Sequence, residues 1–251
     1  MTIAVLMCCY TRAQTPPSSA GNLSTYVNHL MDTHVGVERM IPPGWSITAK
    51  GVSAGRGPDG KQVVQFHIFV KGGPAGALFE QKVLPVGEET PTSVMQGISA
   101  GKDGILMCAG RVGLQCGDPN NPDDPIEFTV SPEKGEPFRF LFESGGGTIG
   151  IVVVPDPVSD RNKGCTLSAV RLTPGFILAL ITGTGFPPNV DIHYTTPGST
   201  GDQVIRSNDI GVIRFSLLPH PDHPGQTSGT MKLKVTEIQC SPVISYDWSK
   251  L

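Results

Sequence analysis

Hydrophobic residues recur at every second position along most of the chain, which is the spacing of a β-strand with one buried face. One run has apolar residues at Val64, Phe66, Ile68 and Val70. Another run has Phe138, Phe140 and Phe142 on one face, with Arg139 and Glu143 on the opposite face. These patterns predict half-buried sheet strands through most of the chain.

The segment before these strands has a helical spacing instead. Its apolar residues recur at intervals of three and four, at Leu23, Tyr26, Val27, Leu30 and Met31. Asn22 precedes them and suits the N-cap position of a helix. We therefore expect one short helix over residues 22–33, within a stretch of linker and helix at 14–41.

The length of the chain favours two domains. A domain usually has about 100 to 150 residues, and this chain has 251. Residues 155–164 contain two prolines and a polar run that interrupt the apolar pattern, so we expect a linker there. The sequence predicts an all-β protein with an N-terminal β-sandwich domain at 42–154 and a second β-sandwich domain at 165–251.

The second predicted domain alternates short apolar runs with turns to the end of the chain, a spacing typical of an immunoglobulin-like sandwich. One apolar run ends in a Gly-x-Gly-Phe turn formed by Gly183, Gly185 and Phe186. This stretch resembles the strand and turn of IPT/TIG-type immunoglobulin-like domains. The resemblance implies a binding or spacer module without catalytic residues, and it assigns no site residue to this chain.

Charge and hydropathy argue against two classes of protein. The formal net charge is −3 and there is no run of Lys or Arg, so no positive field is available to hold a phosphate backbone. No stretch reaches the roughly 18 apolar residues of a membrane helix. We expect neither nucleic-acid binding nor an integral membrane protein.

Residues 1–13 indicate export. A short apolar run leads to Ala13, after which a secretory signal would be cut. The basic segment that usually precedes such a run is missing, so the signal is truncated and starts upstream of Met1, or else the segment is a disordered tail. Acylation of Cys8 or Cys9, as in a lipoprotein, is a third interpretation. We expect a secreted or periplasmic protein.

The four remaining cysteines fall two to each predicted domain. Such placement indicates disulfides formed in an oxidising compartment, and we expect Cys108 to pair with Cys116 and Cys165 with Cys240. The second pair would close a long loop and stabilise the domain by about 4 kcal/mol. Four unpaired thiols or a four-cysteine metal site are the alternatives, although the chain lacks a C-x-x-C element.

One loop of the first domain is a candidate calcium site. It concentrates oxygen ligands at Asp118, Asn120, Asp123 and Asp124, and calcium prefers oxygen ligands. Pro and Asn are also ordinary turn formers, so a plain turn is the alternative. The sequence indicates no other cofactor.

Other motifs have structural explanations. Ser53 and Ser99 each lie in a G-x-S-x-G sequence, which is typical of hydrolases only where a strand turns sharply into a helix. His220 and His223 would need a further ligand, such as His193, to bind zinc, and a polar surface turn explains them as well.

Four aromatic residues could line a carbohydrate-binding surface: Trp45, Trp248, Tyr194 and Tyr246. Aromatic residues at strand positions are more often part of the core, and we expect core positions here.

No acid, base, nucleophile and metal set converges in the sequence. We therefore expect a noncatalytic extracytoplasmic protein that binds a protein or a glycan, or that serves as a structural spacer. The alternative is a secreted hydrolase whose first domain assembles a site from distant residues, such as Ser53 or Ser99 with His67.

Overall fold

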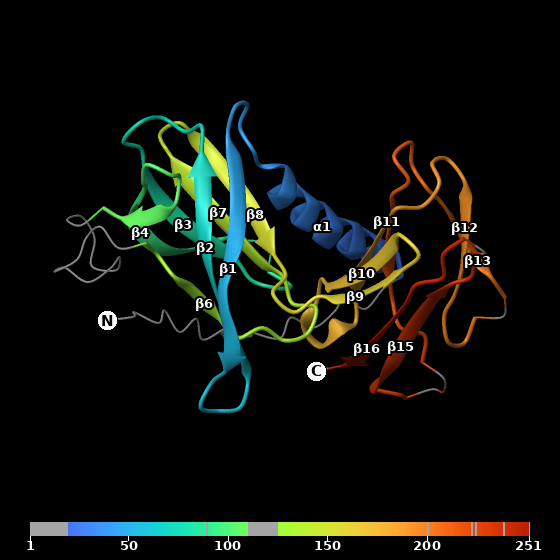
Figure 1. The fold of residues 1–251 in the computed structure, drawn as a ribbon. Coiled ribbons are helices and arrows are strands. Elements are labelled where there is room, and N and C mark those ends of the chain that lie inside the picture. Colours follow the sequence, from blue (N-terminus) through green and yellow to red (C-terminus); the bar gives the residue numbers. More distant parts are fainter. Residues whose placement is uncertain are drawn as a thin grey trace. The chain divides into compact units, whose positions relative to one another are not determined.

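The computed structural model describes residues 20–88, 90–109, 125–199, 201–221, 223, 225–237 and 239–250. These residues form one helix, α1 (Ala20–Arg39), and antiparallel strands arranged in four open sheets (Figure 1). Among them, no helix is both long enough and apolar enough to span a membrane.

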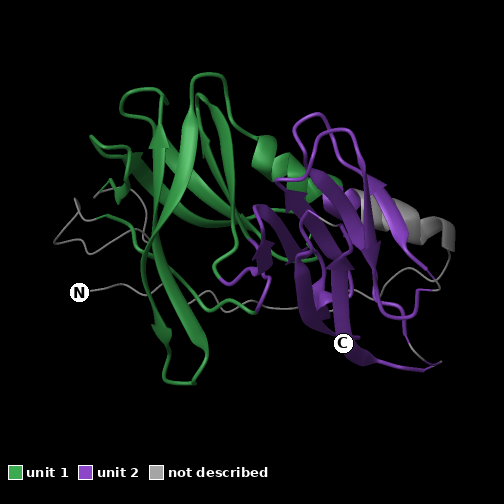
Figure 2. Ribbon diagram, turned by 45° about the vertical axis from the view of Figure 1, so that its right-hand side comes forward, with its two compact units in different colours: residues 1–12, 32–133, 138–155 green, residues 13–31, 134–137, 156–251 purple. Residues whose placement is uncertain are grey.

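The chain divides into two compact units (Figure 2). Unit 1 contains Asp32–Glu133 and Phe138–Pro155, and unit 2 contains Lys134–Pro137 and Asp156–Leu251. Helix α1 is shared, since its residues up to Met31 belong to unit 2 and those from Asp32 belong to unit 1. Each unit has its own pair of sheets.

Unit 1 has a three-stranded and a five-stranded sheet. The first has the order β1 (Ser46–Arg56), β2 (Gln62–Lys71), β6 (Phe128–Val130). The second has the order β5 (Leu106–Cys108), β4 (Thr92–Ala100), β3 (Leu78–Leu84), β7 (Phe138–Ser144), β8 (Gly147–Val153). Such a pair of antiparallel sheets is consistent with a β-sandwich.

The core of unit 1 follows the predicted alternation. Phe66, Ile68 and Val70 of β2 are all buried. Phe128 packs between the sheets, with its ring 5.8 Å from that of Phe66 and 5.6 Å from that of Phe140. Aromatic rings at these separations hold the two sheets together.

Strand β7 is buried on both faces, so the prediction of a half-buried strand was wrong here. Leu141 packs with Val37 of α1, Leu84 and Val152, and this cluster covers the face that was expected to meet solvent. Arg139 on the same face is only 1% exposed. Its guanidinium donates to the carbonyl oxygen of Leu84 at 3.0 Å and also to that of Pro85. Burial lowers the pKa of Arg139 to about 10.

Unit 2 has two four-stranded sheets. The first has the order β14 (Ile213–Leu217), β11 (Ala179–Thr184), β10 (Cys165–Arg171), β9 (Val158–Asn162). The second has the order β13 (Gln203–Arg206), β12 (Asp191–Thr195), β15 (Ser228–Val235), β16 (Val243–Ser249). Strand β9 lies within residues 155–164, where we expected a linker.

A buried cluster joins the two sheets of unit 2. It includes alternate residues of β10 and β15, such as Leu167, Ala169, Met231 and Leu233. A short 3-10 turn, η1 (Pro174–Phe176), places the ring of Phe176 at 4.0 Å from that of Tyr246. The period-two pattern in these strands therefore matches burial on one face.

Helix α1 is longer than the predicted span of 22–33. His34 and Val37 are buried and continue the spacing of Leu30 by four and then three residues. The polar His34 hid this continuation in the sequence. Asn22, expected as the N-cap, lies inside the helix, which begins at Ala20.

Candidate functional site

Three loops of unit 2 are tied together by covalent and polar contacts. They connect β11 to β12 (residues 185–190), β13 to β14 (207–212) and β15 to β16 (236–242). We call residues 185–191 and 206–212 the paired loops.

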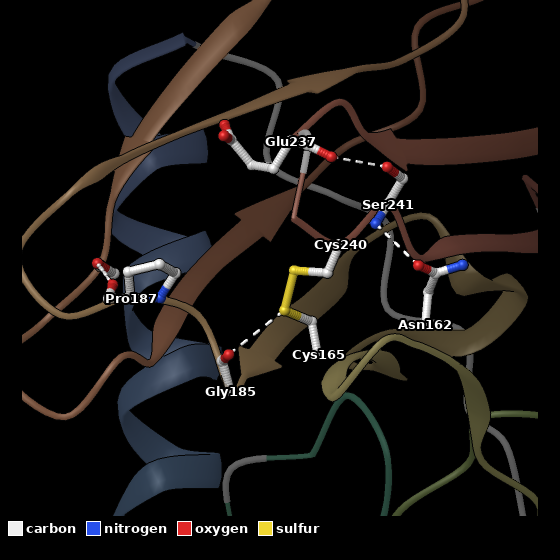
Figure 3. Close-up of a disulfide and its surroundings, with 8 residues drawn as sticks. Asn162, Cys165, Gly185, Pro187, Glu237, Cys240 and Ser241 are labelled. Atoms are coloured by element: carbon white, nitrogen blue, oxygen red, sulfur yellow. Dashed lines mark hydrogen bonds between the residues drawn. A yellow bond between two sulfur atoms is a disulfide. The ribbon is translucent and has the colours of Figure 1, made fainter.

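The disulfide joins Cys165, at the start of β10, to Cys240 in loop 236–242, with Cα atoms 5.9 Å apart (Figure 3). Cys165 Sγ also lies 3.3 Å from the carbonyl oxygen of Gly185, the first residue of the paired loops. One sulfur bridge thus links loop 236–242 to β10 and contacts the β11–β12 loop.

Side chains of β9 anchor the same loop. Asp160 Oδ2 accepts a hydrogen bond of 2.7 Å from the N–H of Val243, the first residue of β16. Asn162 Oδ1 accepts one of 3.3 Å from the N–H of Ser241 (Figure 3). The hydroxyl of Ser241 donates to the carbonyl of Glu237 at 2.8 Å. Loop 236–242 is therefore held at both ends.

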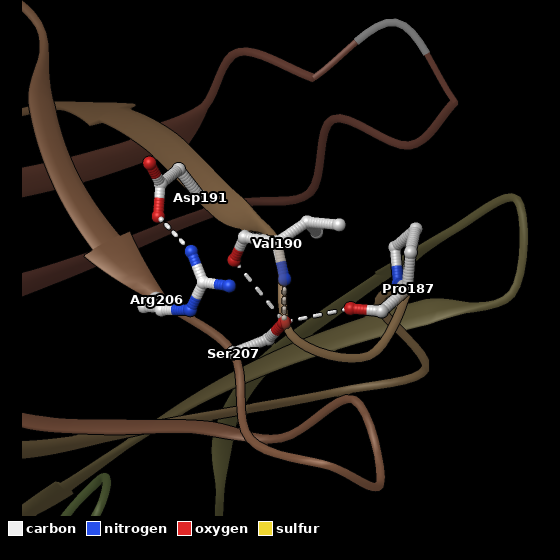
Figure 4. Close-up of polar contacts among 5 residues, drawn as sticks. All are labelled: Pro187, Val190, Asp191, Arg206 and Ser207. Carbon is white, nitrogen blue, oxygen red and sulfur yellow. Dashed lines mark hydrogen bonds and ion pairs between the residues drawn. The ribbon is translucent and has the colours of Figure 1, made fainter.

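Ser207 joins the paired loops (Figure 4). Its side chain is buried, and Oγ accepts a hydrogen bond of 3.0 Å from the N–H of Val190. The hydroxyl donates to the carbonyl of Pro187 at 2.7 Å. The N–H of Ser207 in turn donates to the carbonyl of Val190 at 2.9 Å. One small side chain thus satisfies backbone groups of the neighbouring loop, which would otherwise be buried without partners.

Asn208 shapes the turn that follows. Its side-chain oxygen accepts from the N–H of Ile210 at 3.1 Å and from that of Val212 at 2.8 Å. Gly211 has a φ of 73°, and a Cβ there would collide with the carbonyl oxygen of Phe186. The turn therefore requires glycine at this position, and it packs closely against the other loop.

Each of the paired loops carries one exposed aliphatic side chain. Ile210 is 74% exposed and Val190 is 37% exposed. Asp209 beside them is exposed, and Asp191 forms an exposed ion pair with Arg206 at 3.3 Å (Figure 4). The hydrogen-bonded turn therefore leaves an aliphatic side chain exposed among charged neighbours in the sequence.

The zinc hypothesis gains no support within the described part of the chain, where no group of three or more His, Cys, Asp or Glu residues could hold a metal. His193 and His220 are both exposed. His220 lines an open hollow of about 490 Å³ together with Thr196 and Asp202.

The two G-x-S-x-G serines lie within antiparallel strands. Ser53, on the exposed strand β1, pairs with Gln65 in register, and its hydroxyl donates to the side chain of Gln65. Ser99 lies in β4 opposite Leu78 and Met107. His67 lies opposite Lys50 in the β1–β2 ladder. Neither serine sits at the strand-to-helix turn that the hydrolase motif requires.

Several predicted residues lie outside the described residues. They are the calcium candidates Asp118, Asn120, Asp123 and Asp124, together with Cys116 and residues 1–13. Cys108 is disulfide-bonded, and its pairing with Cys116 stays a prediction.

The four aromatic residues considered for carbohydrate binding are not exposed. Trp248 and Tyr246 are 5% and 3% exposed, within the core of unit 2. Trp45 and Tyr194 are half-buried and pack against Phe79 and Phe215. Burial also raises the pKa of Tyr194 and of Tyr246 above the usual range of a tyrosine.

Sequence reasoning missed Ser207, Asn208 and Ile210. A signal was present, because Asn followed by Asp, Ile and Gly between two apolar runs is typical of a turn in which the Asn side chain bonds to the backbone. The role of Ser207 depends on a loop 17 residues away, and no local pattern reports it.

Comparison of the chain with protein-family models, curated proteins and solved structures finds no match. The case for a function therefore depends on the residues of this chain alone.

Proposed function

We propose that this chain is a noncatalytic binding protein that acts outside the cytoplasm, and that the paired loops of unit 2 bind another protein. The observation that carries the proposal is the bonding of Ser207 to both Pro187 and Val190. It joins two loops into one surface that presents Ile210. A surface ordered before binding loses less conformational entropy on association.

The strand order of unit 2 supports an immunoglobulin-like assignment. We take β10, β11 and β14 of one sheet as strands A, B and E. In the other sheet, β13, β12, β15 and β16 then correspond to strands C′, C, F and G. The loops 185–190 and 236–242 then correspond to the B–C and F–G loops, which lie at one end of such domains and bind antigen in antibodies. The Gly183 to Phe186 turn that resembles IPT/TIG-type domains lies at the start of the B–C loop.

The chemistry of the surface favours a protein over a glycan. Sugars are commonly bound by stacking on exposed aromatic rings, and the four candidate aromatic residues are buried or half-buried. Ile210 and Val190 instead offer exposed aliphatic side chains, and their neighbours in the sequence include Asp209 and the Asp191–Arg206 ion pair. An apolar centre within a polar rim is the usual anatomy of a protein interface.

The disulfide supports a location outside the cytoplasm. Disulfides persist in oxidising compartments and are rare where thiols are kept reduced. The Cys165–Cys240 bridge belongs to the framework that holds the loops, so the same compartment would maintain the binding surface. The hydrolase alternative receives no comparable support from the described residues, and we do not propose it.

A photo-crosslinking experiment tests the protein-binding proposal. A photoreactive phenylalanine analogue replaces Ile210 or, separately, Val190, and the full chain is produced in its native host and irradiated. We expect the same crosslinked protein from both positions. Leu218, which is 41% exposed elsewhere in unit 2, serves as the control and should not capture it.

A competition step makes the result specific. An excess of the protein without the photoreactive residue should suppress the crosslink. The same excess of protein carrying Ile210→Asp should not. Equal crosslinking from Leu218, or undiminished competition by Ile210→Asp, would show that the paired loops are not the binding surface.

A further inference from the structure

Gln81 is a polar side chain in the core of unit 1. It is 1% exposed and lies on β3 between the buried residues Phe79 and Val83. Neither its amide nitrogen nor its amide oxygen has a hydrogen-bond partner among the described residues. A buried amide without partners destabilises a fold because it has lost its bonds to water, so such groups normally bond to protein or to ordered water.

A small cavity lies beside this amide. Gln81, Met95 and Phe140 line one part of it, and residues 126–130, which include all of β6, line the rest. Its space is about 20 Å³. About 10–15 Å³ is enough to hold one water molecule, so the cavity can hold one water and is too small for a larger ligand.

The cavity lies along β6, which ends its sheet among the described residues. The sheet order is β1-β2-β6, so β6 pairs with β2 at Val64, Gln65 and Phe66, and no other described strand pairs with it. Just before β6, the N–H of Ile126 donates to the carbonyl of Leu106 in β5. Thr129 Oγ1 on this strand is also buried without a partner among the described residues. Backbone groups at an unpaired edge need partners as well.

We propose that Gln81 and strand β6 enclose a binding site for a single ordered water molecule. A water makes two to four hydrogen bonds to otherwise unsatisfied buried groups, and typically about three. Gln81, whose amide offers both donors and an acceptor, lines the cavity, and so do the residues of β6. The water connects the five-stranded sheet to β6 of the three-stranded sheet. This site is independent of the protein binding proposed for unit 2.

A crystal structure of the unchanged full-length protein gives the first test. We expect an isolated peak of density in the cavity, at about 2.7–3.2 Å from the Gln81 amide. An empty cavity, or a Gln81 amide bonded directly to a protein group, would overturn the proposal even without any variant.

The variant Gln81→Met gives the second test, since methionine has a similar shape and no hydrogen-bonding amide. We expect loss of the density peak, and an increase of roughly tenfold in the hydrogen-exchange rates of the amides of β6, because their edge opens more readily. The matched control is Gln96→Met, at an exposed position of the adjacent strand β4. It should keep both the peak and the exchange rates.

The two measurements separate the possible results. Density that persists unchanged in Gln81→Met, or exchange rates of β6 that equal those of the unchanged protein, would show that Gln81 does not hold a water there. A folded Gln81→Met protein is verified beforehand by the exchange pattern of β8, which pairs with neither β3 nor β6 and lends no residue to the cavity.

Discussion

The N–H of Val190 donates a hydrogen bond of 3.0 Å to Oγ of Ser207, and the N–H of Ser207 donates one of 2.9 Å to the carbonyl of Val190. This reciprocal pair joins two loops that are separated by strands β12 and β13 (Figure 4). A Cβ at Gly185 would collide with the carbonyl oxygen of Gly164, and a Cβ at Gly211 would collide with that of Phe186. The paired loops therefore pack closely against each other and against the turn between β9 and β10.

Ser207→Ala should destabilise unit 2 by about 1–3 kcal/mol, because the N–H of Val190 loses its acceptor and the carbonyl of Pro187 loses its donor. Chemical unfolding followed by a probe in unit 2 measures the effect. Ser228→Ala, at an exposed position of β15, is the control and should change stability by less than about 0.5 kcal/mol. Equal stability of the two variants would mean that Ser207 does not hold the loops.

Replacing both Cys165 and Cys240 by alanine should lower the free energy of unfolding by about 4 kcal/mol. The bridge spans 75 residues of sequence, and the closure of so long a loop restricts the unfolded chain strongly. The measurement is chemical unfolding of the oxidised protein and of the double variant. Reduction of the unchanged protein should produce a loss at least as large, because it also breaks the disulfide of Cys108. A double variant that is as stable as the oxidised protein would contradict this account of the bridge.

Tyr246→Phe should stabilise unit 2 by about 1 kcal/mol near neutral pH, because the buried Tyr246 hydroxyl has no partner among the described residues. Burial raises the pKa of Tyr246 in the folded protein above its ordinary value of 10.0. The unfolded tyrosine therefore ionises at a lower pH than the folded one. The free energy of unfolding is unaffected by this difference below pH 10, and it falls as the pH rises further.

Thermal unfolding at several pH values from neutral to alkaline tests this prediction. The Phe variant should lose less stability above pH 10 than the unchanged protein does. Parallel curves for the two proteins would show that Tyr246 does not titrate differently in the folded and unfolded states.

Arg139→Ala should destabilise unit 1 by at least about 3 kcal/mol, because it leaves a cavity and deprives the carbonyls of Leu84 and Pro85 of their donor. Chemical unfolding monitored in unit 1 provides the measurement. Arg56→Ala, on the exposed strand β1, should have an effect within about 0.5 kcal/mol. A loss at Arg139 no greater than that at Arg56 would refute the structural role.

Sequence reasoning failed where polar residues take structural roles through distant partners. Residues 158–162 are mostly polar and were interpreted as a linker, yet they form β9. Asp160 and Asn162 hold loop 236–242 across a sequence distance of about 80 residues. The sequence shows that these residues are polar, but its local pattern does not show which distant residues they form hydrogen bonds with.

The sequence by itself determined which side of most strands is apolar, because the two-residue period of a strand sends alternate side chains to opposite faces. It therefore predicted the buried positions of β2, the β-rich class and the single helix. Only the tertiary structure decided that both faces of β7 are covered, that Ser207 meets Val190, and that Gln81 lines a cavity along β6. These features depend on contacts between residues far apart in the chain, and local periodicity carries no information about them.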